Sequence, residues 1–235
     1  IMALPKLNDT PKYSVDVPSM KTTVKFRPFL VKEEKVLLLA MESDQEDQIL
    51  GAILDTIESC IVDKLDITQL TTYDIEYLFT KIRGKSVGET TKVKLKCETC
   101  ETENDVIIPL DDIKVVGDDV DPIIELQPGM QLEMRHPSYY ELKNDEHIQS
   151  GETAAATFAM IRHCLKNIKT EENLINLKDE PAKEVDEFIE SMNTEQFEKV
   201  RYFVETIPAM KHDIEFDCSC GHHNKIELKG MQSFF

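Results

Sequence analysis

Residues 96–110, KCETCETENDVIIPL, and residues 217–231, DCSCGHHNKIELKGM, follow the same pattern. Each stretch contains a pair of cysteines, has an asparagine four residues after the second cysteine, and continues as an alternating apolar run. Alternation of apolar and polar residues is typical of β-strands. The stretches ETTKVKLK (residues 89–96) and KHDIEF (residues 211–216) alternate in the same way before the cysteines. Each cysteine pair is therefore predicted to lie at the turn of a β-hairpin.

A helix is expected before each hairpin. Thr72 precedes Cys97 by 25 residues, and Thr194 precedes Cys218 by 24. Apolar residues lie at matching places in the two intervals, namely Ile75, Leu78 and Ile82 in the first and Phe197, Val200 and Val204 in the second. We therefore predict a duplicated unit of helix, strand, cysteine turn and strand, whose two copies pack against each other.

The two cysteine turns together offer the four thiolates of a tetrahedral structural zinc site. The predicted ligands of this single zinc ion are Cys97, Cys100, Cys218 and Cys220. The second pair has a gap one residue shorter than the first, so a site in which His222 or His223 replaces one cysteine stays open. Four protein ligands leave no position for water, so we expect a structural metal and no catalysis. The two hairpins must then meet in space.

The two remaining cysteines, Cys60 and Cys164, lie within helical apolar patterns and are predicted to pack in the core. His163 is the neighbour of Cys164, but adjacent residues on a helix point about 100° apart, which argues against a nucleophile pair. The glycines and lysine of IRGKSVGE (residues 82–89) lack the spacing of a phosphate-binding loop. We expect a helix that ends before Gly84, followed by a tight turn.

The composition excludes several classes of partner. The chain has 45 acidic and 27 basic residues, a formal net charge of −18, which repels phosphate backbones and anionic membranes. No apolar run is long enough to span a bilayer. The first residues do not show the pattern of a secretion signal, so we expect a reducing compartment, where close cysteine pairs favour metal over disulfides.

The expected fold class is α+β, with two zinc-ribbon-like units of helix plus β-hairpin brought together through the metal site and a mainly helical insertion. TAAATFAMIRHCLKNI (residues 153–168) is predicted to be one of the inserted helices, and a Pro-Gly turn at 128–129 predicts a hairpin before them. The predicted segments are an extended N-terminal arm (1–24), a first α+β unit with its cysteine hairpin (25–110), a connecting β-hairpin (111–136), a helical region (137–206), and the second cysteine hairpin with an aromatic tail (207–235).

Three stretches carry a likeness to a known family: KFRPFLVKEEKVLLLAMES (residues 25–43), KIRGKSVGE (81–89) and CGHHNKIELKGMQSFF (220–235). In their order and combination they resemble the baseplate hub subunit family of T4-like tailed bacteriophages. The resemblance implies a non-enzymatic virion protein of the tail baseplate, made in the bacterial cytoplasm, that contacts other hub, tube or wedge proteins and has no small-molecule substrate. The zinc prediction depends on the cysteines of this sequence alone.

The two ends of the chain are the predicted contact points with such partners. The arm can lie along a neighbour or pair with a sheet edge, and the terminal Phe234 and Phe235 can anchor a contact. Self-packing of these phenylalanines against the second hairpin is the alternative. Two other functions stay open: an assembly factor absent from the mature virion, and a zinc-ribbon adaptor for nucleic acid, which the net charge disfavours.

Overall fold

The computed structural model describes residues 10–43, 45–118, 120–150 and 153–233. The chain divides into two compact units, and each is described by itself. Unit 1 contains residues 1–67, 73–115 and 209–235, and unit 2 contains residues 68–72 and 116–208. Most of unit 2, residues 116–208, is therefore inserted between the two cysteine stretches. Its other segment, residues 68–72, leads into the helix that precedes the first cysteine stretch.

The first part of unit 1 is a β-hairpin with three helices. Its elements are β1 (Tyr13–Val17), β2 (Thr22–Phe26), α1 (Val31–Glu42), α2 (Glu46–Cys60) and α3 (Thr72–Ser86). β1 and β2 are antiparallel, with Val15 opposite Val24 and both side chains buried. The arm predicted over residues 1–24 is thus wrong for residues 13–24, because alternating valines give this segment an apolar face to bury.

The α3 helix passes through Gly84 and ends two residues later, so the predicted stop at this glycine is wrong. Gly84 is buried, and a β-carbon placed on it would lie 3.7 Å from the side chain of Leu110. A small residue is therefore needed here for close packing and not for a turn. Gly88, where φ is +155°, lies in the connection between the end of α3 and the next strand.

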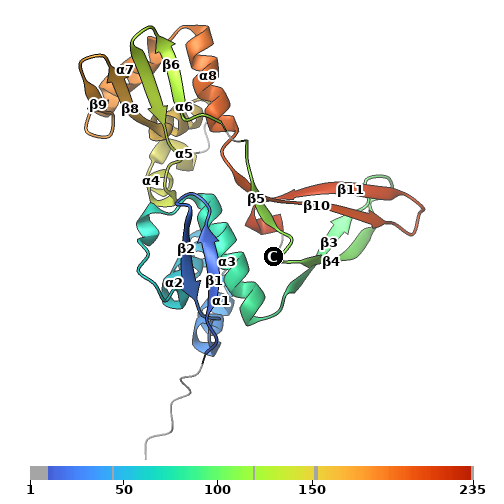
Figure 1. The fold of residues 1–235 in the computed structure, drawn as a ribbon. Coiled ribbons are helices and arrows are strands. Elements are labelled where there is room, and N and C mark those ends of the chain that lie inside the picture. The colour runs from blue at the N-terminus through green and yellow to red at the C-terminus, as the bar shows by residue number, and fades with distance from the viewer. Residues whose placement is uncertain (1–9, 44, 119, 151–152, 234–235) are drawn as a thin grey trace, which may run out of the picture. The chain divides into compact units, whose positions relative to one another are not determined.

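The second part of unit 1 consists of the two cysteine hairpins (Figure 1). β3 (Thr90–Lys96) pairs with β4 (Glu103–Pro109), and β10 (Ala209–Asp217) pairs with β11 (His223–Lys229). β5 (Lys114–Val116) lies on the other side of β10, which gives the strand order β11-β10-β5. A small core joins the two sheets, with buried residues Ile108, Leu110, Ile113, Met210, Ile214 and Leu228.

The helix α3 connects this core to the rest of unit 1. The Thr80 hydroxyl lies 3.4 Å from the Met210 sulfur, and the Lys81 ammonium donates to the backbone carbonyl of Leu110 at 3.3 Å. At the end of β11, the backbone N–H of Met231 donates to the Glu76 carboxylate at 3.2 Å. Both hairpins are therefore fixed to the same helix.

Unit 2 contains a four-stranded antiparallel sheet of order β6-β7-β8-β9. Its strands are β6 (Ile123–Gln127), β7 (Met130–Met134), β8 (Leu165–Thr170) and β9 (Leu174–Asn176). Its helices are α4 (Tyr139–Lys143), α5 (Glu146–Ser150), α6 (Thr153–Cys164), α7 (Ala182–Glu190) and α8 (Thr194–Glu205). Figure 1 shows the longer helices lying against the sheet, and Leu132, Ile161, Val185 and Val200 are among the buried residues of this core.

Three predictions are corrected in this unit. The helix predicted over residues 153–168 ends at Cys164, because Leu165 and Ile168 are buried in a strand that pairs with β7. The region 137–206 therefore contains two strands as well as helices. The predicted connecting hairpin is confirmed as β6 and β7, with Gly129 at φ +78°, but it belongs to this sheet. Its predicted start at residue 111 also includes β5, which pairs with β10.

The predicted duplication holds for the hairpins and not for the helices. The helix before the first hairpin, α3, belongs to unit 1 except for its first residue. The helix before the second hairpin, α8, belongs to unit 2, where Val200 and Phe203 are buried in the core. The α+β class is confirmed, and the repeated structural element is the β-hairpin with a cysteine turn.

Candidate metal centre

The four cysteines of the two hairpin turns come together in unit 1. The Cys97 and Cys220 sulfurs lie 3.8 Å apart, and the Cys100 and Cys218 sulfurs lie 3.6 Å apart. All four sulfurs lie within 4.8 Å of one another. Residues more than one hundred positions apart in the sequence thus form one compact cluster of thiols, as the sequence predicts.

The two turns are built in related ways. In the first, the Cys97 N–H donates to the Thr102 carbonyl at 3.0 Å, and the Glu101 N–H donates to the Cys97 carbonyl at 2.9 Å. In the second, the Cys218 N–H donates to the His222 carbonyl and the Gly221 N–H to the Cys218 carbonyl, both at 2.9 Å. The residue after the second cysteine has positive φ in each turn, +58° at Glu101 and +89° at Gly221. The positive φ turns the chain back into the second strand.

The first cysteine of each pair is buried and the second is exposed. Burial opposes ionisation of Cys97, but hydrogen bonds from the backbone of Cys100 and Thr99 and from the Asn224 side chain lower its pKa below the ordinary value. A backbone hydrogen bond at Cys220, together with the neighbouring thiols, lowers the pKa of Cys218 to about 6. Both buried sulfurs therefore sit where negative charge is stabilised, as thiolate ligands require.

Two asparagines cross between the hairpins. Asn104 donates to the Cys218 sulfur at 3.7 Å, from the first hairpin to the second. The Asn224 side chain accepts from the Glu98 N–H at 3.0 Å, from the second hairpin to the first. The sequence shows both asparagines at equivalent positions, but this equivalence alone does not reveal that each one reaches the opposite turn.

The two alternative histidine ligands lie outside the thiol cluster. The His222 ring lies 3.9 Å from the Glu98 carboxylate, and the His223 ring lies 2.7 Å from the Asp217 carboxylate. Asp217 also raises the pKa of His223 by this hydrogen bond. Of the predicted metal ligands, the four cysteines are the set that the structure brings together. The predicted contact residues Phe234 and Phe235 lie outside the described residues.

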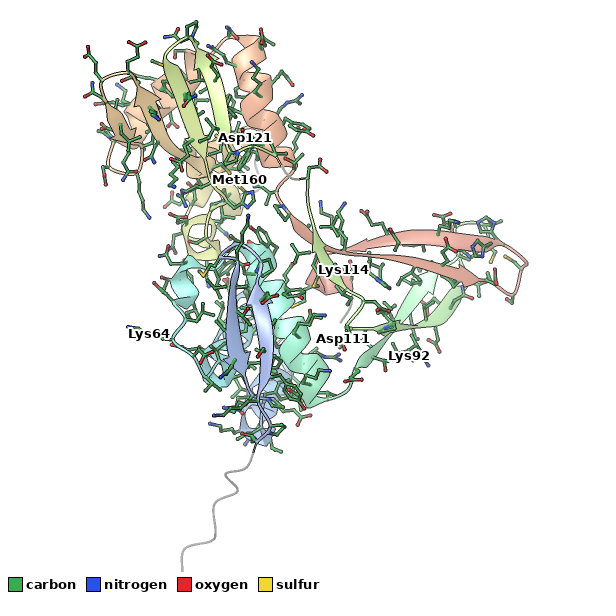
Figure 2. All side chains as sticks on the ribbon, viewed as in Figure 1. Lys64, Lys92, Asp111, Lys114, Asp121 and Met160 are labelled. Carbon is green, nitrogen blue, oxygen red and sulfur yellow. The ribbon has the colours of Figure 1, made fainter. Side chains whose placement is uncertain are left out.

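The surface around the cluster is lined with ion pairs. On the outer face of the first hairpin, Lys92 lies 2.8 Å from Asp105 and Lys94 lies 3.6 Å from Glu103, each pair diagonal across the two strands. Lys92 is labelled on β3 in Figure 2. These exposed pairs contribute little to stability individually. The inner face, with its apolar residues and thiols, is where the hairpins hold together.

The other two cysteines have the predicted core positions. Cys60 and Cys164 are both fully buried. Burial raises the pKa of Cys60 to about 11 and that of Cys164 to about 12, so neither thiol is suited to act as a nucleophile. His163 does not form a pair with Cys164 but hydrogen-bonds Asp145 at 2.9 Å.

The sequence analysis missed an apolar surface on α1. Among the described residues, large exposed apolar side chains are concentrated on this helix: Val31, Val36, Leu38, Leu39 and Met41 are 78%, 47%, 56%, 56% and 57% exposed. The signal in the sequence is the run VLLLAM (residues 36–41), which places apolar residues on every side of a helix and not on one stripe.

None of the helices in the described ranges has the length and apolar character needed to cross a bilayer. The comparisons with known proteins give one finding. The family model described as T4 bacteriophage base plate protein matches residues 10–235, which is nearly the whole chain. No curated protein and no solved structure matches the chain. The baseplate resemblance seen in the sequence is thereby confirmed, and the chain belongs to the T4 bacteriophage base plate protein family.

Proposed function

We propose that this chain is a structural subunit of the contractile phage tail baseplate, at the hub or close to the tube, and that one structural zinc ion joins its two cysteine hairpins. Membership of the baseplate family supports a structural role in the virion tail and contacts with other baseplate proteins. The observation that carries the zinc proposal is the convergence of four thiols from two distant turns.

The sulfur distances fit a zinc ion. Zinc–sulfur bonds of about 2.3 Å give sulfur–sulfur edges of about 3.8 Å in a regular tetrahedron. The Cys100–Cys218 and Cys97–Cys220 sulfur separations are 3.6 and 3.8 Å, and all four sulfurs lie within 4.8 Å of one another. The four sulfurs would complete the coordination shell and leave no position for a substrate or an activated water. The function of the ion is then mechanical: it closes the end of the two-hairpin core.

The apolar core of the two hairpins is small, which explains why a metal is useful. Six buried residues join β3–β4 to the sheet of β5, β10 and β11. Small cores of this kind are commonly supplemented by a metal or by disulfides. The ion would also link two stretches that are separated in the sequence by residues 116–208 of unit 2.

Metal analysis of protein purified without added zinc tests this proposal. We expect about one equivalent of zinc per chain, released when a strong chelator is added, with loss of hairpin stability. Two equivalents would contradict a shared site, because each hairpin would then hold its own ion. Protein that is free of metal and does not take up zinc would remove the metal from the proposed function while leaving the baseplate family intact.

The α1 surface supports a function based on protein contacts. The buried residues of this helix are Ala40 and Glu33, and Glu33 forms an ion pair with the partly exposed Arg27. The exposed face of the neighbouring helix α2 carries Asp55 and Glu58. A surface with this chemistry fits an apolar face with a basic rim on another baseplate protein. The net charge of −18 disfavours a second copy of the same chain as the partner.

Replacement of Leu38 and Leu39 by serine tests the contact. Each side chain is about half exposed, so its further burial in a complex is worth roughly 1 kcal/mol. The double variant should incorporate into baseplates with about 30-fold weaker affinity, which is the effect of roughly 2 kcal/mol. The buried halves of the two side chains are lost as well, so its free energy of unfolding should fall by up to about 2 kcal/mol. Complementation of a phage that lacks the subunit measures tail yield, and urea unfolding measures stability.

The exposed Lys35 on the same helix supplies the control, since Lys35→Ser should leave tail yield unchanged. Unchanged yield in the leucine double variant would contradict a contact at α1. A dimer of the wild-type chain in light scattering, lost in the double variant, would identify a second copy as the occupant instead. Detection of the subunit in purified virions separates a permanent component from an assembly factor that leaves before maturation.

A further inference from the structure

Asn104 and Asn224 occupy equivalent positions in the two hairpins, four residues after the second cysteine of each pair. Each side chain contacts the opposite turn. Asn104 donates to the Cys218 sulfur at 3.7 Å, and Asn224 accepts from the backbone N–H of Glu98, the residue after Cys97, at 3.0 Å. Each cysteine turn therefore receives a side-chain amide from the other hairpin. This crossed arrangement is independent of the apolar core.

The two asparagines are not equally enclosed. Asn224 is fully buried, whereas Asn104 is partly exposed. The Asn224 carbonyl oxygen accepts from the Glu98 N–H at 3.0 Å, and its amide nitrogen donates to the His222 carbonyl at 3.3 Å. A buried amide that lost these partners would incur the full cost of desolvation. Asn224 is thus held in one orientation, with one hydrogen bond to Glu98 of the first turn and one to His222 of the second.

We infer that Asn224 is the positioning residue of the metal centre, holding the first turn in place through the Glu98 N–H beside the Cys97 ligand, with Asn104 as its weaker counterpart at the Cys218 sulfur. This inference rests on the proposed zinc site. The ligand is a divalent ion that prefers tetrahedral sulfur, because the described cluster consists of four cysteine sulfurs and contains no carboxylate or imidazole. Loss of such a supporting contact typically weakens metal binding 10- to 100-fold.

The variants Asn224→Ala and Asn224→Asp separate the two roles of this side chain. Alanine removes the oxygen that accepts from the Glu98 N–H, whereas aspartate keeps such an oxygen. Both variants lose the donation to the His222 carbonyl, so the difference between them reports the contact with the first turn.

Competition with a chromophoric chelator measures zinc affinity, and the absorption of the Co²⁺-substituted protein reports the geometry of the thiolate shell. We expect Asn224→Ala to bind zinc 10- to 100-fold more weakly than the wild type and to show an altered Co²⁺ spectrum, and Asn224→Asp to recover part of the affinity. Wild-type affinity and an unchanged spectrum in Asn224→Ala would overturn the role of Asn224 while the zinc proposal stands. A wild-type chain that binds neither ion would instead refute the metal site itself.

A variant at the other asparagine keeps the test open if Asn224→Ala does not fold. Asn104 is partly exposed, so Asn104→Ala should leave the fold intact while removing the donor to Cys218. We expect faster transfer of zinc to the chelator and a smaller loss of affinity than at Asn224. Wild-type transfer kinetics in Asn104→Ala would contradict the crossed arrangement.

Discussion

The two cysteine hairpins reach the same geometry from different local sequences. The first has two residues between its cysteines, Glu98 and Thr99, and the second has one, Ser219. The shorter turn is closed by a hydrogen bond from residue 221 back to residue 218, and the longer turn by one from residue 101 back to residue 97, both at 2.9 Å. Both turns then use one residue with positive φ directly after the second cysteine.

The comparison shows which features of a cysteine turn matter for the site. The gap between the cysteines differs, yet the sulfurs of both pairs enter one cluster of 4.8 Å. What the hairpins share is the burial of the first cysteine, the positive φ after the second, and the asparagine that crosses to the other turn. A shortened gap therefore does not require a histidine to replace a cysteine.

The largest expected effect comes from removing one sulfur from either hairpin. Cys100→Ser and Cys220→Ser change the exposed cysteine of each pair. If both sulfurs bind the same ion, each variant should destabilise both hairpins by several kcal/mol, a part of the roughly 10–16 kcal/mol of apparent binding free energy at structural zinc sites. Hydrogen exchange of the β3–β4 and β10–β11 amides, with urea unfolding, measures this loss.

The metal-free proteins supply the control for these two variants. Serine is close to cysteine in size, so the difference from wild type should nearly disappear when a chelator removes the ion from all three proteins. Faster exchange confined to β3–β4 in Cys100→Ser, or to β10–β11 in Cys220→Ser, would show that the hairpins are stabilised separately and would break the comparison.

Gly221→Ala should have a smaller effect, on the second turn only. The φ of +89° is a conformation that a residue with a β-carbon adopts at a cost of about 1–2 kcal/mol. No atom lies within 4 Å of the position of an added β-carbon, so the expected loss is due to the backbone and not to a steric clash. Urea unfolding of the zinc-loaded protein should show this decrease, with zinc stoichiometry unchanged. A wild-type unfolding curve would mean that the turn can adopt another conformation.

The sequence predicts the hairpins and their convergence because both depend on local and pairwise rules. Alternation identifies the strands, the cysteine pairs mark the turns, and the need for four ligands brings two pairs together. The predicted extent of α6 fails for a different reason. Leu165 and Ile168 fit a helical pattern equally well, and only pairing with β7 decides that they form a strand. Non-local pairing of this kind is not encoded in the periodicity of a short segment.

The division into units was equally hidden from the sequence. Ile82 and Val204 lie at matching distances before the two cysteine pairs, yet their helices are packed in different cores. Matching apolar positions show that a helix has a face to bury, but not which surface will cover it. The crossing asparagines have the same character: their spacing is visible in the sequence, whereas Asn224 reaches Glu98 only through the folding of residues 126 positions apart.

Glu101→Gly should give the smallest effect and one of opposite sign to that of Gly221→Ala. Glu101 is exposed and has a φ of +58°, so glycine would remove a backbone strain of about 1–2 kcal/mol. Glycine also makes the unfolded chain more flexible, which offsets roughly 0.5–1 kcal/mol of that gain. We expect the free energy of unfolding of the zinc-loaded protein to rise by up to about 1 kcal/mol. Glu103→Gly, at an exposed position in β4, is the matched control and should lower it, because glycine weakens a strand. If both glycine variants lower stability equally, Glu101 is not strained, and the two turns do not use positive φ for the same purpose.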